Sequence, residues 1–291
     1  MTKDNNIQKG DYLDHGGLDN LLSQLKIPPS PNGKEEVWSR ILDGVENEQK
    51  QASFNYNAFR WIAAIVVLLI VSSVGVNLQF AKKRYEAPYG EVAYLTLPDS
   101  SVVTLNAGTT IEHKEYGFNR RREVRIDGEA LFEVNSSDRD FVVHAGNYSV
   151  RVLGTRFNVF YRDNILEVKC IEGLVGIEHK GIETKKISAG EGILLQPKSN
   201  ELKRLSVDIK KSASWVHGEF YYTQTPLSTV FDEFERQFNV KVKVQGFNPQ
   251  SRLYTGYFSN NSIAVALELV CLPMGLSYEI DKAKGLVRVY Q

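Results

Sequence analysis

The sequence has very few cysteines and no excess of charge of either sign. Only Cys170 and Cys271 occur among 291 residues, too few for a secreted module held together by disulfides. Cys170 alternates with Leu166 and Val168, as a core strand residue would, and we expect both cysteines in the core. The 35 basic residues balance 35 acidic ones. The composition therefore indicates no nucleic-acid partner.

Patterns typical of catalysis and metal binding are also missing. The five histidines do not stand at metal-ligand spacing. The stretch "GEGILL" lacks a third glycine, "NGKEE" lacks the hydroxyl residue of a phosphate loop, and no G-x-S-x-G occurs. The run Arg120–Arg122 is interpreted as a solvated hairpin face in preference to an anion site. We expect no enzyme activity, no cofactor and no metal.

One long apolar run stands in this otherwise polar chain, "WIAAIVVLLIVSSVGV" from Trp61 to Val76. With Asn77–Phe80 it reaches the length of about 20 residues that crosses a hydrocarbon core. A buried helix of a soluble protein would keep a polar stripe, whereas only Ser72 and Ser73 are polar here. We therefore predict a single transmembrane helix at residues 59–80. The flanking charges slightly favour the opposite orientation, but a large domain translocates regardless of them, so we expect the N-terminus in the cytoplasm.

Residues 1–58 form the predicted cytoplasmic tail with short helices. "IPPSPNG" separates two apolar patterns, and the second follows Glu35 and Glu36, which suit the first turn of a helix. The apolar residues of this second helix share one face; they are Val37, Trp38, Ile41, Leu42 and Val45. Such a face packs on the first pattern, lies on a bilayer, or docks into a partner's groove. The net acidity of the tail disfavours the bilayer, and the other two possibilities stay open.

Residues 81–198 have turn signals every 8 to 12 residues and no long helical pattern. The runs "ALFEV", "YSVRVL", "FNVFY" and "LEVKC" alternate apolar and polar residues, so each strand places its apolar side chains on one face. This pattern predicts an all-β domain, β-solenoid-like, sandwich or barrel. The spacing alone does not choose among them.

The spacing of the apolar residues changes after a polar linker at residues 199–214, where helical patterns join those of strands. Residues 215–291 contain the strand candidates "GEFYY", "NVKVKV", "LYTGYF", "LSYEI" and "LVRVY" and two amphipathic helices. The first helix has an apolar face made of Leu227, Val230, Phe231, Phe234 and Phe238. These elements predict a small α+β domain in the order βαββαββ.

Several motifs resemble a known family. "LPDSSVVTLNAGTTI", "VRIDGEALFEV", "FVVHAG", "VRVLGTRFNVF", "CIEGLVGI" and "ISAGEGILL" resemble the successive motifs of the FecR family of membrane-anchored sigma-factor regulators. The densest agreement is at Gly128, Glu129, Ala130, Leu153, Gly154, Thr155 and Phe157. Residues 215–291 resemble the C-terminal domain of Bacteroidetes members, which is similar to the secretin and TonB short N-terminal domain. The family turn "PDGS" is "PDSS" here, and Asp140 replaces a frequent proline.

The resemblance implies a bacterial inner-membrane anti-sigma factor. Its tail would bind an extracytoplasmic-function sigma factor through Val37, Trp38, Ile41, Leu42 and Val45. Its periplasmic part would sense the substrate-bound state of a TonB-dependent outer-membrane receptor, whose periplasmic signalling domain would contact Tyr254, Tyr257 and Tyr290 on two edge strands. An intramembrane protease is a further implied partner.

The family-motif residues are expected to serve folding. Gly128 and Gly154 should have positive φ angles or a tight approach to a neighbouring strand. A structural or assembly role in the envelope is the alternative function, because secretin-like domains also serve as assembly modules. A membrane-anchored glycan-cleaving enzyme ranks below it, since the acids Glu129 and Glu133 on one strand face are usually solvated.

Overall fold

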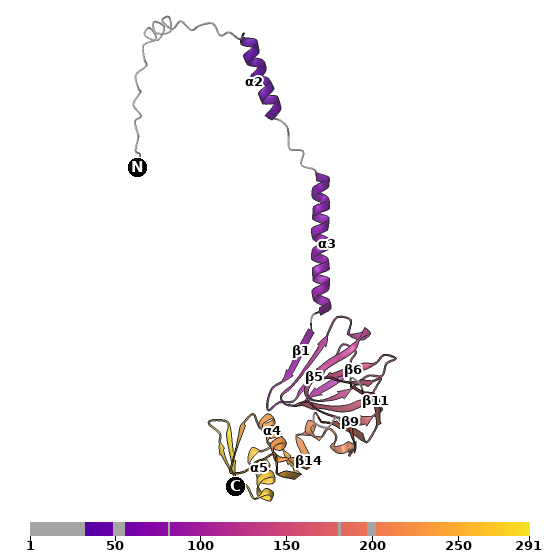
Figure 1. Cartoon of the computed structure of the whole chain (residues 1–291), viewed down its shortest axis with the longest axis vertical. Coiled ribbons are helices and arrows are strands. Elements are labelled where there is room, and N and C mark those ends of the chain that lie inside the picture. Colours follow the sequence, from indigo (N-terminus) through magenta and orange to yellow (C-terminus); the bar gives the residue numbers. More distant parts are fainter. Residues whose placement is uncertain (1–32, 49–55, 81, 180–181, 197–201) are drawn as a thin grey trace, which may run out of the picture. The chain divides into compact units, whose positions relative to one another are not determined.

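The computed structural model describes residues 33–48, 56–80, 82–179, 182–196 and 202–291. The chain separates into two compact units, Met1–Leu68 and Leu69–Gln291. Helix α2 (Lys34–Glu48) lies in the first unit, and helix α3 (Tyr56–Phe80) begins there (Figure 1). All the described strands lie in the second unit.

The predicted transmembrane helix is wrong. Over the described residues, no helix combines the length and the apolar character that crossing a membrane requires. The apolar stretch of α3 is only 16 residues long, Trp61–Val76, and its continuation contains the polar Asn77 and Gln79. At about 1.5 Å per residue this stretch covers about 24 Å, less than a hydrocarbon core of about 30 Å. The predicted inner-membrane location stays a prediction.

The residues after α3 form one 13-stranded sheet, which with its turns makes up the sheet domain, residues 82–206 (Figure 1). Its strands are β1 (Lys82–Ala87), β2 (Ala93–Thr96), β3 (Val102–Leu105), β4 (Thr109–Lys114), β5 (Arg122–Glu133), β6 (Phe141–Ala145), β7 (Tyr148–Val152), β8 (Arg156–Arg162), β9 (Ile165–Glu172), β10 (Leu174–His179), β11 (Ile182–Ser188), β12 (Glu191–Leu195) and β13 (Leu202–Ser206). The main path of the sheet runs β11-β10-β7-β6-β5-β8-β9-β12-β13. Strand β13 lies within the stretch that the sequence predicted as a linker.

The long strand β5 belongs to both halves of this sheet. Its first half pairs with β4 and β6, and its second half pairs with β3 and β8. Gly128 stands where the partners change, with a φ of 127°, and a Cβ there would lie 2.7 Å from Thr109 Cα. The sheet therefore curls about β5, and the predicted sandwich or solenoid is wrong. A sandwich consists of two separate sheets, whereas β5 joins both halves of this structure into one sheet. A solenoid repeats the same strand pairing from turn to turn, and the pairings of β5 do not repeat.

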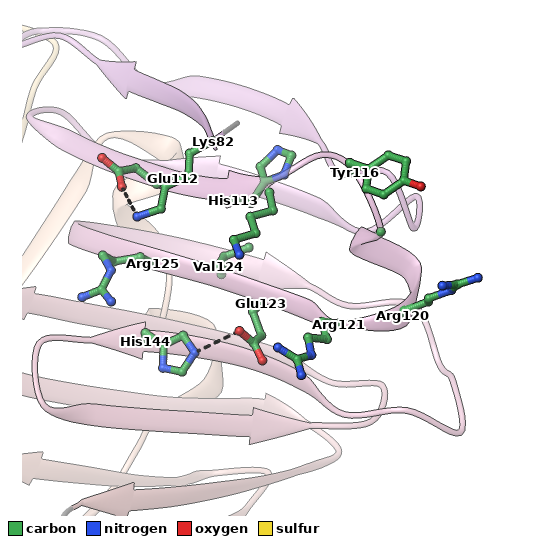
Figure 2. Close-up of a pocket in the computed structure, with 12 residues that line it drawn as sticks. Lys82, Glu112, His113, Tyr116, Arg120, Arg121, Glu123, Val124, Arg125 and His144 are labelled. Carbon is green, nitrogen blue, oxygen red and sulfur yellow. Dashed lines mark ion pairs between the residues drawn. The ribbon is translucent and has the colours of Figure 1, made fainter. Parts of the chain in front are cut away.

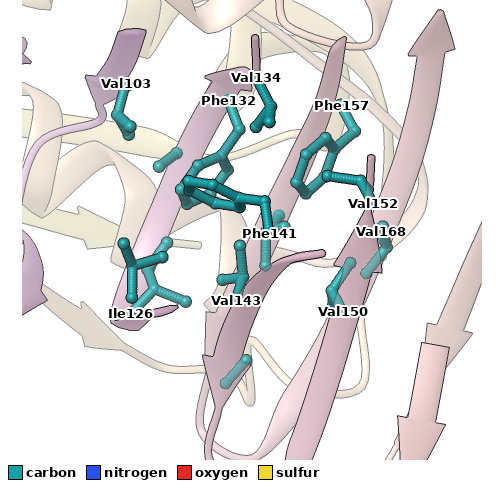
Figure 3. Packing of buried hydrophobic residues seen from close by; sticks show 14 of the residues in the cluster. Val103, Ile126, Phe132, Val134, Phe141, Val143, Val150, Val152, Phe157 and Val168 are labelled. Atoms are coloured by element: carbon teal, nitrogen blue, oxygen red, sulfur yellow. The ribbon is translucent and has the colours of Figure 1, made fainter. Parts of the chain in front are cut away.

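One hydrophobic core fills the curled sheet (Figure 3). Alternate residues of the strands point into it, as in β5, where buried and exposed residues alternate from Arg122 to Gly128. Phe132 stacks on Phe157 with ring centroids 5.2 Å apart and meets Phe141 edge to face at 6.1 Å. Such aromatic pairs add about 0.5–1.5 kcal/mol beyond their buried area.

The C-terminal domain, residues 214–291, has its strands and helices in the predicted βαββαββ order. They are β14 (Glu219–Pro226), α4 (Leu227–Phe238), β15 (Lys241–Gln245), β16 (Leu253–Ser259), α5 (Ile263–Cys271), β17 (Ser277–Asp281) and β18 (Leu286–Tyr290). The strands form two small sheets, β14-β16 and β15-β18-β17. The apolar face of α4 packs into the core as expected, with Leu227, Val230 and Phe234 fully buried. Both cysteines are also fully buried, which confirms that prediction.

Candidate functional site

Helix α2 presents an exposed apolar face. The negative charges of Glu35 and Glu36 in its first turn stabilise the helix, because they lie at the positive end of its dipole. Arg40 also pairs with Glu36 at 3.7 Å. The predicted sigma-factor residues lie on one side of it with large exposed fractions: 46% for Val37, 61% for Trp38, 49% for Ile41 and 61% for Leu42. Val45 belongs to the same helix, but its side chain lies outside the described residues.

Of the three predicted receptor-binding tyrosines, Tyr257 lies on an exposed aromatic surface. It is 48% exposed and stacks on Tyr221, which is 41% exposed, with centroids 5.7 Å apart. Lys211 Nζ lies 4.9 Å from the centre of the Tyr221 ring. The Tyr221 hydroxyl donates to Glu219 at 2.9 Å, and this hydrogen bond raises the pKa of Tyr221. We call Tyr221 and Tyr257 the aromatic pair, and Lys211 lies beside it.

Tyr254 does not belong to this surface. It is 2% exposed, and its hydroxyl lies 3.2 Å from the Tyr257 carbonyl and 3.1 Å from the Leu269 carbonyl. Burial raises the pKa of its phenol. Tyr254 therefore fixes α5 against β16 from within the core.

Tyr290 is 42% exposed, but its strand is not an edge. Strand β18 is central in its sheet, with Tyr290 opposite Gln245 of β15 on one side and Ser277 of β17 on the other. Both rows of its main-chain groups face other strands, so no partner strand can join it. The predicted edge position of "LVRVY" is wrong, and the edges of this sheet are β15 and β17.

A polar contact connects the sheet domain to the C-terminal domain, and we call it the junction. Its members are Asn106, Glu129, Asn158, Trp215, Glu233 and Gln237. Asn158 Nδ2 donates to Glu129 at 2.8 Å, and Asn158 Oδ1 accepts from the Trp215 indole at 3.0 Å. Asn106 Nδ2 donates to the other Glu129 oxygen at 2.9 Å. Glu129 thus binds two amide groups of its own domain, one of which continues to Trp215.

Helix α4 completes the junction from the other side. Gln237 Nε2 donates to Asn106 Oδ1 at 2.7 Å and to Glu233 Oε1 at 2.8 Å. Asn106 Nδ2 also lies 3.3 Å from Glu233 Oε1, and Arg236 pairs with Glu233 at 2.8 Å. Asn106, Asn158, Glu233 and Gln237 are nearly inaccessible to solvent, so these hydrogen bonds are shielded from water.

Two carboxylates approach each other in the junction. Burial raises the pKa of Glu129, and the negative charge of Glu233 raises it further. Lys169 and the two amide groups act in the opposite direction. Lys169 itself lies 2.8 Å from Glu167, and although its burial opposes charge, Glu167 and Glu129 raise its pKa overall. The junction therefore holds a carboxyl group whose ionisation is disfavoured where the two domains meet.

The motif residues mostly serve the architecture. A Cβ on Gly154 would lie 2.6 Å from Ser136 Cα, which agrees with the predicted tight approach. Thr155 donates to the Leu174 carbonyl at 3.1 Å. Leu153 is 52% exposed, whereas Ala130 and Phe157 are fully buried. Glu129 is the exception, because it hydrogen-bonds into the junction.

The run Arg120–Arg122 is not one solvated face. Arg122 is 3% exposed and pairs with Asp99 at 3.2 Å. Its guanidinium also donates to the carbonyl groups of Asn135 and Arg139 in one loop and of Leu153 in another, so with Asp99 it connects three loops. Arg120 and Arg121 are exposed. A run of like charges in the sequence alone does not indicate which of its side chains is buried.

The sequence reasoning missed the junction amides and Tyr221. One signal was present, since Asn158 is a polar residue inside the apolar run "FNVF". A buried amide in such a strand needs hydrogen-bond partners. Among the described residues, no three His, Cys, Asp or Glu side chains gather as a metal site. The two thiols are unreactive by burial, which raises the pKa of Cys170 to about 11 and that of Cys271 to about 12.

Comparison with known proteins agrees with this architecture. The model of the FecR protein family matches residues 83–176, and the model of the FecR C-terminal domain matches residues 219–287. Two crystal structures of a candidate anti-sigma factor from Parabacteroides distasonis, at 2.50 and 1.65 Å resolution, are 25% identical to this chain. Each match covers 72% of this chain and 99% of that chain, with TM-scores of 0.67 and 0.66. No curated protein matches the sequence.

The two family matches fall on the sheet domain and on the C-terminal domain, and the solved structures share the fold of both. The chain therefore belongs to the FecR family of anti-sigma factors.

Proposed function

We propose that this anti-sigma factor binds an extracytoplasmic-function sigma factor through α2 and reports to it the substrate-bound state of a TonB-dependent receptor. The proposal assumes the predicted location, with α2 in the cytoplasm and the C-terminal domain in the periplasm. The observation that carries it is the exposed apolar face of α2, with Trp38 at its centre. The intramembrane protease stays a predicted partner.

The spacing on α2 supports docking into a groove. Trp38, Ile41 and Leu42 stand at positions i, i+3 and i+4, which one face of a partner's groove can cover together. Burial of such side chains contributes about 25 cal/mol per Å² of apolar surface. Large aromatic side chains at the centre of an interface usually dominate its binding energy.

The aromatic pair supports a receptor contact on the C-terminal domain. Tyrosine side chains are enriched in interface cores because they supply a large apolar area and a hydrogen-bonding hydroxyl. Tyr221 and Tyr257 lie on neighbouring strands that pair with each other alone among the described strands. The outer sides of β14 and β16 thus leave main-chain groups for a partner strand, next to the aromatic pair.

The junction supports transmission between the two domains. A partner bound to the C-terminal domain acts on a body that Trp215, Glu233 and Gln237 attach to the sheet domain. Any movement of α4 must rearrange hydrogen bonds that water cannot easily replace. A movement of the C-terminal domain caused by binding at the aromatic pair would therefore reach the sheet domain through the junction.

Titration of the full chain with its cognate sigma factor tests the proposal. Trp38→Ala should weaken binding by about 2 kcal/mol or more, a factor of about 30. Asp43→Ala is the matched control, because Asp43 is exposed on the same helix but stands five residues from Trp38, away from the apolar face. The control should bind like the wild type. Equal affinity of Trp38→Ala and the wild type would sink the proposal.

A further inference from the structure

A groove lies on the outer face of the sheet domain (Figure 2), and the proposed function does not use it. Its cavity volume is about 520 Å³, within the range of small-molecule sites. The side-by-side strands β1, β4, β5 and β6 form its floor. The turn at Tyr116 and Gly117 and the two residues Arg120 and Arg121 line one end.

The groove is strongly basic, although the whole chain has no net charge. Five cations line it, namely Lys82, Lys114, Arg120, Arg121 and Arg125. Only two carboxylates oppose them, those of Glu112 and Glu123. Lys82 at 3.8 Å and Arg84 at 3.6 Å share the Glu112 carboxylate, and His144 lies 3.8 Å from Glu123. The lining therefore has three positive charges in excess.

Three arginines line this groove without a protein partner in the described part of the chain, and the side chain of one of them, Arg120, points outward at its end (Figure 2). Within the described residues, Arg120, Arg121 and Arg125 make no hydrogen bond and no ion pair through their side chains. The strand register places Arg125 between Glu112 of β4 and His144 of β6. Because two other cations already share Glu112, Arg125 has no neutralising partner next to it.

We propose that this groove binds a phosphate-bearing anion. A carboxylate would neutralise one of the three excess charges, whereas a phosphate monoester brings about −1.5 to −2 and three acceptor oxygens. Guanidinium groups bind phosphate through two parallel hydrogen bonds, and lysine adds a point charge. Tyr116, which is 69% exposed at the rim, offers a flat surface for the organic part of such a ligand.

The phosphate can come from a soluble molecule or from a lipid headgroup, and two probes distinguish these sources. Inorganic pyrophosphate is titrated into the full chain by calorimetry in an uncharged detergent. Vesicles that contain phosphatidic acid, whose headgroup is a phosphate monoester, are compared with vesicles of phosphatidylcholine, which controls for adsorption through apolar residues. Binding of pyrophosphate indicates a soluble ligand, and binding of the phosphatidic acid vesicles alone indicates a lipid headgroup.

The double variant Arg121→Gln, Arg125→Gln assigns the binding to the groove. The double variant removes two guanidinium groups that would bind the phosphate, so affinity for the bound probe should fall at least about tenfold. Lys243→Gln is the matched control, since Lys243 is an exposed cation on β15 in the C-terminal domain, and it should leave affinity unchanged. The thermal midpoint confirms that the variants are folded, and Arg125→Gln alone replaces the double variant if that midpoint falls. Failure of both probes to bind, or equal binding by wild type and variant, would overturn the proposal.

Discussion

Truncation of Asn158 to alanine should loosen the C-terminal domain from the sheet domain. Asn158 is 1% exposed, so its two hydrogen bonds have no water to replace them. The donation to Glu129 at 2.8 Å involves a carboxyl group, and a bond of this kind contributes about 1.5–3 kcal/mol when that group is charged. The Trp215 indole at 3.0 Å would lose its acceptor, which costs about 1–3 kcal/mol when the N–H group stays buried.

Together these losses should lower the free energy of unfolding by about 3 kcal/mol. This value is near the low end of their sum, because the surrounding side chains relax in part around the missing amide. For a unit of roughly 150–250 residues, 1 kcal/mol shifts the thermal midpoint by about 2–4 °C. The midpoint should therefore fall by about 6–12 °C. Calorimetry of the full chain measures the midpoint, and amide hydrogen exchange locates the loss. We expect α4 to lose protection before the strands of the sheet domain.

Two further variants sharpen this experiment. Asn119→Ala removes an exposed asparagine of the sheet domain and should leave the midpoint unchanged. Asn158→Asp keeps the shape but places a second carboxyl group beside Glu129, so its destabilisation should be larger at pH 7 than at pH 5. An Asn158→Ala chain with the wild-type midpoint and unchanged protection of α4 would refute the reasoning, because the junction would then contribute no coupling.

Two other predictions concern Glu129 and Gly154. Because burial and Glu233 raise the pKa of Glu129, its contribution to stability is full below the ordinary carboxyl pKa and is lost as the pH rises through the folded value. The midpoint of Glu129→Gln relative to wild type should thus improve from pH 5 to pH 8, and a constant difference would contradict this. Gly154→Val should destabilise the sheet domain by about 3 kcal/mol or more, because a Cβ would lie 2.6 Å from Ser136 Cα. Gly176→Ala, with no atom nearer than 3.6 Å, is the control in the same thermal scan, and an unchanged midpoint for Gly154→Val would count against the steric argument.

Side-chain alternation predicted the core of the sheet domain well. Phe132, Phe157, Val168 and Cys170 were placed on inward faces from period alone, and all are fully buried. Alternation also explains the burial of Tyr254, which was predicted to contact the receptor. Tyr254 and Phe258 are four residues apart on one strand and share a face, and both are buried.

The pairing of strands could not be predicted in the same way. Strand β5 lies parallel to β6, its successor in the chain, and antiparallel to β8, and turn spacing contains neither fact. The junction was equally hidden, because Asn106 and Glu233 are 127 residues apart. A single sequence records which residues tend to be buried, but not which distant groups meet. The apolar run of α3 misled because its length was counted with Asn77–Phe80, a segment that contains the polar Asn77 and Gln79.

The central claim is that the C-terminal domain receives the receptor's signal and that the sigma factor responds. Output from the sigma-dependent promoter, with and without receptor ligand, tests it most directly in cells carrying Tyr257→Ala. Tyr94→Ala is the matched control, since Tyr94 is a 68% exposed tyrosine on β2 of the sheet domain. We predict that the wild type and the control change their output when ligand is added, whereas Tyr257→Ala keeps the basal output and no longer responds. A full response in Tyr257→Ala would contradict the claim and place the sensing surface elsewhere in the chain.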